Sequence, residues 1–278
     1  MNAISKPLTA LDTAAKGSID ISGLRPVACD SLVRMGSAND GGYVVPLSAV
    51  KAANVLLSFG LSHNWTFERD FKRLNPAVLI HCYDHTVSFQ TTIEYSVRQL
   101  LISILRFSGT ALRRAAAWLD YPIFFRGNVI HFKTRVWPDR QQESATIDDI
   151  FGRLPPESRV FVKMDIEGSE YRVLDDLLRH ADTIEAIAIE FHDIDMLVQR
   201  FNELTEKIKE KFHIVHIHAN NHMGVTPCNF PIALEVSFLN RRNFASIPER
   251  SLLEYPVPGL DQPNNPRSPD IKLNFDAR

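Results

Sequence analysis

Polar residues follow several apolar runs of this sequence, and two of the groups carry carboxylates. Asp165 and Glu167 close the run RVFVKMD and lie two residues apart. Glu190 and His192 close a second run and alternate across Phe191, so in an extended strand both side chains point to the same side. A carboxylate beside an imidazole can act as a base near neutral pH or bind a divalent cation. Asp165, Glu190 and His192 are therefore candidate catalytic residues and candidate metal ligands.

The same residues also have simpler structural explanations. Glu167 suits the start of the helix expected after it, where an acid complements the helix dipole. His192 could cap a loop, an explanation that we weigh equally with catalysis. Asp165 is harder to explain in this way.

A histidine-rich stretch follows another apolar run. His216 and His218 share one face of the expected strand, with Asn220 just beyond them. Their spacing resembles that of a metal pair, but no cysteine or close third histidine completes a structural zinc site. We therefore favour acceptor binding, with His218 as a candidate catalytic residue. Glu235 is interpreted either as a solvated residue or as a partner of these histidines.

Two earlier runs end in residues suited to an adenosine cofactor. Gly60 ends the first, where a missing side chain would let the backbone approach a ligand. Asp84 ends the second, where an acid can accept hydrogen bonds from ribose hydroxyls, the alternative being a turn or cap residue. The sequence contains no GxGxxG motif, which a pyrophosphate would require, so a nicotinamide cofactor is disfavoured.

These residues share one edge of a predicted α/β fold. Apolar runs alternate with helix-like segments, as expected for a parallel sheet covered by helices. Ligands of such doubly wound sheets bind beyond the carboxyl ends of the strands. Strands are predicted at 54–59, 77–83, 129–136, 159–165, 184–190, 214–219 and 232–239, and helices at 66–74, 167–178 and 196–212.

The remaining segments divide the chain further. We expect a flexible leader over 1–23, one large domain over 24–245 and a proline-rich tail over 246–278, which is either an extended wrap or a mobile end. NDGGYVVP at 39–46 predicts a hairpin or a cover over the cofactor. A helical insertion at about 90–126 is basic and amphipathic. We expect it to pack on its own sheet, in preference to acting as a lid or contacting a membrane surface.

Composition limits the classes of partner and compartment. A net charge of −2 provides no general attraction to nucleic acid, so a small-molecule or glycan acceptor is preferred. No run is long and apolar enough for a signal peptide or a transmembrane helix. Cys29, Cys82 and Cys228 are too widely spaced for a disulfide framework, so we expect a cytoplasmic protein.

Several separated blocks resemble the FkbM-type methyltransferases, which are mostly associated with O-methylation of sugars and natural products. The strongest is VKMDIEGSEYRVL at 162–174, and the similarity extends over about residues 30–242. The other blocks, in order, are NDGGYVVP, LLSFGLSHNWTFERDF, YDHT, IEFHDID, HIHANN and PIALEVSF. The resemblance implies a class I methyltransferase fold, a Rossmann-like sheet of seven mostly parallel strands with helices on both faces and one late antiparallel strand. It also implies S-adenosylmethionine as the cofactor.

The same resemblance implies roles for individual residues. Asp84 would hold the ribose, Asp165 would lie near the transferred methyl group, and Glu190 or His192 would remove the proton of an acceptor hydroxyl. The complete set of expected cofactor-binding residues is Ser58, Phe59, Gly60, Leu61, Asp84, His85 and Asp165. The first block departs from the usual glycine-rich pattern, having only SFGLSHN. Two rivals remain: a metal-dependent hydrolase or transferase, and a non-catalytic cofactor-binding module.

Overall fold

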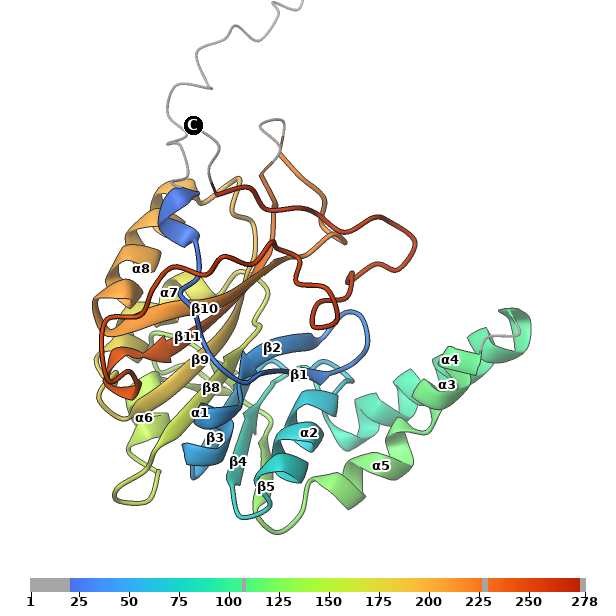
Figure 1. Ribbon diagram of the computed structural model, residues 1–278. Helices are drawn as coiled ribbons and strands as arrows, with labels where there is room; N and C mark the ends of the chain where they lie inside the picture. The colour runs from blue at the N-terminus through green and yellow to red at the C-terminus, as the bar shows by residue number, and fades with distance from the viewer. Residues whose placement is uncertain (1–20, 107–108, 227–229, 276–278) are drawn as a thin grey trace, which may run out of the picture.

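A seven-stranded sheet forms the centre of the protein. The computed structural model describes residues 21–106, 109–226 and 230–275. The strand order is β10-β11-β9-β8-β3-β4-β5, and β11 is antiparallel to both neighbours whereas all other pairs are parallel (Figure 1). The sheet strands are β3 (Val55–Phe59), β4 (Leu79–Tyr83), β5 (Val129–Phe132), β8 (Val160–Met164), β9 (Ile184–Phe191), β10 (Phe212–Ala219) and β11 (Leu234–Asn240). The predicted fold class, including the late antiparallel strand, is confirmed.

Helices cover both faces of this sheet (Figure 1). Because the central strands are covered on both sides, every residue of β3, β8 and β9 is buried. Apolar residues of α7 and α8 join the core on one face, and those of α1 and α2 join the core on the other. The helices of the body are α1 (Leu47–Ala52), α2 (Thr66–Leu74), α6 (Ile147–Phe151), α7 (Glu170–Leu178) and α8 (Val198–Lys211), with short 3-10 helices at Ser22–Leu24 and Arg241–Asn243.

The predicted strand at 129–136 is wrong in its second half. β5 ends at Phe132, because the N–H of Thr134 bonds back to the carbonyl of Phe132 at 2.7 Å and turns the chain out of the sheet. The next strand, β6 (Arg135–Val136), pairs instead with β7 (Ser144–Ala145) in a separate two-stranded sheet.

The NDGG segment forms the turn of a β-hairpin. β1 (Leu32–Gly36) pairs antiparallel with β2 (Gly42–Pro46), and Gly41 in the turn has a φ of +83°. All of β2 is buried, and Ser237 of β11 donates a hydrogen bond to the carbonyl of Val44. The hairpin thereby fixes Tyr43 above the central sheet.

The helical insertion forms an arm that projects away from the sheet (Figure 1). It consists of α3 (Phe89–Arg106), α4 (Gly109–Ala115) and α5 (Ala117–Phe124). The expectation that it packs on its own sheet is therefore wrong for most of its length. Asp120 of α5 attaches the base of the arm to the body. Its carboxylate accepts hydrogen bonds from Trp65 and Arg69.

The proline-rich tail packs along the body. Tyr255, Val257 and Phe275 are buried in the core that α7 and α8 share. Residues 1–20 of the expected leader, and Cys228, lie outside the described residues, while Cys29 and Cys82 are free thiols. In the part of the chain that the structure describes, no helix has the length and apolar character needed to cross a bilayer.

Candidate functional site

The carboxyl edge of the sheet brings Asp165, Glu190 and His192 together. β8 and β9 are parallel neighbours, so the residues that end them meet at one edge. The Nε2 atom of His192 lies 3.8 Å from Oδ1 of Asp165 and 3.8 Å from Oε1 of Glu190. The same atom lies 3.7 Å from Oε2 of Glu167. Three carboxylates from two adjacent strand ends therefore surround one imidazole nitrogen.

A buried acid fixes the orientation of this imidazole. Oε1 of Glu170, at the start of α7, lies 3.2 Å from Nδ1 of His192 and also accepts a hydrogen bond from the N–H of Ile166. Glu170 has no exposed surface. Because Nδ1 faces Glu170, Nε2 is directed toward Asp165, Glu167 and Glu190.

Tyr43 links the two central carboxylates, although it was not among the residues predicted from the sequence. Its hydroxyl lies 3.1 Å from Oδ2 of Asp165 and 3.2 Å from Oε2 of Glu190. A hydroxyl has one proton to donate, so the two carboxylates share a single donor. Asn220 donates a hydrogen bond of 2.6 Å to Oε1 of Glu190. The signal in the sequence was a tyrosine next to the NDGG turn.

Lys163 is a second site residue that was not predicted from the sequence. Its Nζ donates to the carbonyl of Gly60 at 2.6 Å and lies 3.4 Å from Oδ2 of Asp165. Burial lowers the pKa of Lys163, but the charges of Asp165 and Glu68 outweigh this effect and raise the pKa above its ordinary value. The side chain therefore stays cationic. A single lysine within the apolar run VFVKM was the available signal, because a buried ammonium group requires a carboxylate partner.

The cluster formed by Asp165, Glu167, Glu190 and His192 favours the protonated forms of Glu190 and His192. Burial raises the pKa of Glu190, and the charges of Asp165 and Glu235 raise it further. Burial lowers the pKa of His192, but Glu170, Glu190 and Asp165 outweigh it and raise the pKa above its ordinary value. The cluster at neutral pH thus contains a protonated imidazole beside a carboxyl group that is unusually basic.

Gly60 serves a different purpose from the one expected. Its φ is +83°, and a Cβ atom built there would lie 1.7 Å from the carbonyl oxygen of Asp165. The missing side chain therefore allows two strand ends to touch, and the space is not left for a ligand. Ser58 and Phe59, at the end of β3, and Leu61, just after Gly60, are buried.

Asp84 organises the same loop. Oδ2 accepts hydrogen bonds from the N–H groups of Leu61 and Ser62, and Oδ1 accepts from the N–H and the hydroxyl of Thr86. These hydrogen bonds outweigh burial and lower the pKa of Asp84. All four acceptor positions of the carboxylate are engaged, whereas the next residue, His85, is exposed. The ribose role of Asp84 stays a prediction.

His218 lies away from the cluster, beneath the tail. Its Nδ1 is 3.1 Å from Oε2 of Glu235, and its Nε2 is 3.1 Å from both carboxylate oxygens of Asp270. His216 similarly lies 3.2 Å from Asp261. Both histidines thus contact acids of the tail, while Asn220 alone of this stretch reaches Glu190.

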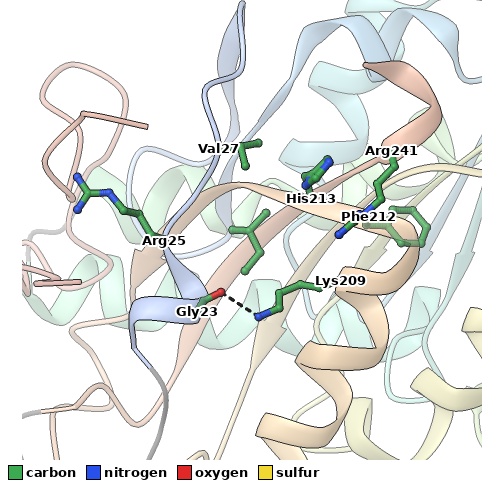
Figure 2. Close-up of a pocket in the computed structure, with 8 residues that line it drawn as sticks. Gly23, Arg25, Val27, Lys209, Phe212, His213 and Arg241 are labelled. Carbon is green, nitrogen blue, oxygen red and sulfur yellow. Dashed lines mark hydrogen bonds between the residues drawn. The ribbon is translucent and has the colours of Figure 1, made fainter. Parts of the chain in front are cut away.

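Two cavities lie at the opposite edge of the sheet, near the amino ends of the parallel strands. The first has a volume of about 160 Å³, and Figure 2 shows Lys209 donating a hydrogen bond to the carbonyl of Gly23 beside it. The second, of about 490 Å³, lies beside Phe151 and His180. Neither of these two cavities is lined by a residue of the cluster.

Comparison with known families identifies the segment that carries this cluster. Residues 130–215 match the methyltransferase FkbM domain. The matched segment contains Asp165, Glu167, Glu190 and His192. The resemblance to the FkbM family is therefore confirmed over residues 130–215, which include both strand ends that carry these four residues.

Other comparisons are more distant. No curated protein matches the sequence. A fibrillarin/Nop5p complex shares 8% identity over 68% of this chain and 73% of that chain, with a TM-score of 0.37. Precorrin-6y C5,15-methyltransferase from Geobacter metallireducens shares 12% over 70% and 86%, with a TM-score of 0.35. A predicted O-methyltransferase from Agrobacterium tumefaciens shares 13% over 70% and 79%, with a TM-score of 0.34. Likenesses at this level carry no argument about the function of the chain.

Proposed function

We propose that this protein is an S-adenosylmethionine-dependent methyltransferase that methylates a hydroxyl group of a sugar, glycan or natural product. The observation that carries the proposal is the position of the FkbM match. It contains Asp165, Glu190 and His192, whose side chains converge at the edge of the sheet where ligands of such folds bind.

The acidic side chains at this edge complement the positive charges of the cofactor. S-adenosylmethionine carries a sulfonium and an ammonium group, and both cations favour an acidic surface. Asp165 is 25% exposed and Glu167 is 88% exposed, so carboxylates are available to a ligand there. His85 offers an exposed side chain at the end of β4, next to Asp84, whose carboxylate already accepts four hydrogen bonds. When bound, the cofactor supplies an electrophilic methyl group.

We assign the proton acceptor to Glu190 and a positioning role to His192. The raised pKa of Glu190 makes its carboxylate a stronger base than an exposed glutamate. A protonated His192, held by Glu170, offsets the negative charge of Glu190 and Asp165. Glu190 would accept the proton that the acceptor hydroxyl loses as its oxygen takes the methyl group, and the sulfur of the cofactor would be the leaving group.

The same geometry supports a second candidate, in which the cluster holds a divalent cation. The three distances from Nε2 of His192 to carboxylate oxygens are 3.7–3.8 Å. One ligand atom from each of Asp165, Glu190 and His192 lies within 4.8 Å of the other two, close enough for all three to bind one cation. Asp165, Glu190 and His192 would be the ligands, and the cation would orient the acceptor or serve a hydrolase.

Calorimetry with S-adenosylhomocysteine, with and without EDTA, tests these assignments. The proposal expects wild-type protein to bind the ligand, and Glu190→Gln to keep that binding while methyl transfer to a glycan acceptor falls by at least about 100-fold. Failure to bind S-adenosylhomocysteine, together with EDTA-sensitive hydrolytic activity, would overturn the methyltransferase assignment. Binding without transfer to any acceptor would favour the non-catalytic module.

A further inference from the structure

The arm formed by α3, α4 and α5 exposes an unusual amount of apolar surface. Of the 18 large hydrophobic side chains exposed in the described part of the chain, 11 lie on these helices. They are Phe89, Ile93, Val97, Leu100, Leu101, Ile104, Leu105, Leu112, Trp118, Leu119 and Ile123. Exposed apolar residues gathered on one part of a stable protein in this way indicate a binding site.

The pattern along α3 is the reverse of that in an ordinary surface helix. Exposed apolar residues recur every three or four positions, which places them along one stripe. On the inner side, Thr92 and Ser96 are buried, and the hydroxyl of Ser96 accepts a hydrogen bond from the N–H of Trp118. By contrast, Leu105 is 79% exposed. The arm therefore packs internally through small polar side chains and presents its leucines outward.

The arm is also positively charged, unlike the rest of the chain. Residues 89–126 contain five arginines and two acids, a net charge of +3, whereas the whole chain carries −2. Arg98, Arg114 and Arg126 are exposed. One of the two acids, Asp120, pairs with Arg69 of the body. Outward apolar residues flanked by arginines are the pattern of helices that bind at the surface of anionic membranes.

We propose that this arm docks on the surface of an anionic lipid bilayer, with its exposed leucines and isoleucines in the interfacial region and Arg98 and Arg114 beside the headgroups. Charge argues against a second copy as the occupant, because a symmetric contact between two arms would oppose +3 to +3.

Docking would also bring the candidate site to the lipid. α3 leaves the body just after the carboxyl end of β4. Tyr95 of α3 stacks on His63, which lies in the loop after β3 (the β3 loop), with 4.2 Å between the ring centroids. The arm is therefore joined to the edge that carries the cluster. The inference itself does not depend on the proposed methyl transfer.

Vesicle co-sedimentation of the full chain tests the proposal. We expect binding to vesicles of phosphatidylcholine with phosphatidylserine, weakened by salt, and little binding to phosphatidylcholine alone. The double substitution Leu101→Glu, Leu105→Glu should weaken binding at least about tenfold, as should Arg98→Ala combined with Arg114→Ala. The matched control is Ile247→Glu with Leu252→Glu, which alters two residues that are 91% and 90% exposed outside the arm and should leave binding unchanged.

Tests of folding and light scattering complete the experiment. A far-UV circular dichroism spectrum and a cooperative urea unfolding transition like those of the wild type show that the arm variants are folded, whether or not S-adenosylhomocysteine binds, and loss of vesicle binding in those variants then supports the proposal. The proposal is overturned if the wild type does not bind anionic vesicles, or if the control variant loses as much vesicle binding as the arm variants do. It is also overturned if the wild type is a dimer that the leucine substitutions convert to a monomer without any vesicle binding, because a second copy then covers the arm.

Discussion

Glu190 on β9 and Glu235 on β11 lie directly opposite each other, and both are almost completely buried. Like charges in this position repel, so each carboxylate needs its own partners. Glu190 contacts Tyr43 and Asn220. Glu235 contacts His218 of β10 and accepts a hydrogen bond from Asn264 of the tail. A buried pair of acids therefore links the tail to the candidate base.

This link predicts a pH dependence of stability. Burial lowers the pKa of His218, but hydrogen bonds with Asp270 and Glu235 outweigh it and raise the pKa to about 10. A raised pKa stabilises the fold fully below the unfolded value of 6.5, and that contribution is lost as the pH rises toward 10. In the wild type, the unfolding free energy measured by urea denaturation should therefore fall as the pH rises from 6.5 toward 10. We expect this fall to be smaller in His218→Gln. His222→Gln, at an exposed histidine, should keep the wild-type slope. Equal slopes in all three proteins would contradict the prediction.

A second prediction concerns the hydroxyl between the two carboxylates. Tyr43→Phe leaves Asp165 and Glu190 without their shared partner, so the pKa of Glu190 should rise further. The pH at which methyl transfer is half-maximal should then move upward. The unfolding free energy should fall by about 1–3 kcal/mol, the usual cost of an unpaired buried polar group. Tyr95→Phe, which removes a hydroxyl outside the site, is the matched control. An unchanged pH profile would show that Tyr43 does not influence the base.

The sequence was sufficient to predict the sheet and the central cluster, for a definite physical reason. Strands buried on both faces appear as apolar runs, and the polar residues that end them must meet at one edge. That logic placed Asp165, Glu190 and His192 together. It could not find Tyr43 or Lys163, because their roles depend on how a hairpin and a neighbouring loop pack over the sheet. It also misjudged the arm, because an amphipathic pattern does not reveal whether the apolar side faces the body or the solvent.

The histidines show the same limit. Their density suggested an acceptor site, yet His216 and His218 contact acids that lie more than 40 residues later in the sequence. No local spacing relates these groups, so only the folded tail reveals the pairing.

A third prediction separates two roles of Asp84. If its carboxylate mainly holds the β3 loop, Asp84→Asn should lower the unfolding free energy of the ligand-free protein by about 1–3 kcal/mol, because an amide nitrogen cannot accept from Leu61, Ser62 or Thr86. Denaturation without cofactor measures this directly. A role confined to the ribose would leave ligand-free stability unchanged and would weaken only S-adenosylhomocysteine binding. The control His85→Gln should leave stability unchanged, because His85 is exposed.

The close approach of β3 and β8 gives the sharpest prediction. Gly60→Ala adds a Cβ atom at a position 1.7 Å from the carbonyl oxygen of Asp165, in a residue whose φ is +83°. Gly259→Ala is the matched control, because φ there is +84° but no atom lies within 4 Å of the added carbon. The control should lose about 1–2 kcal/mol from the strained φ alone. Gly60→Ala should lose at least about 3 kcal/mol, because the backbone of Asp165 must also move. Since Asp165 belongs to the cluster, that movement should weaken S-adenosylhomocysteine binding in Gly60→Ala and leave it intact in Gly259→Ala. Equal losses of stability in the two variants would mean that the contact between the strand ends relaxes freely and does not hold Asp165 in place.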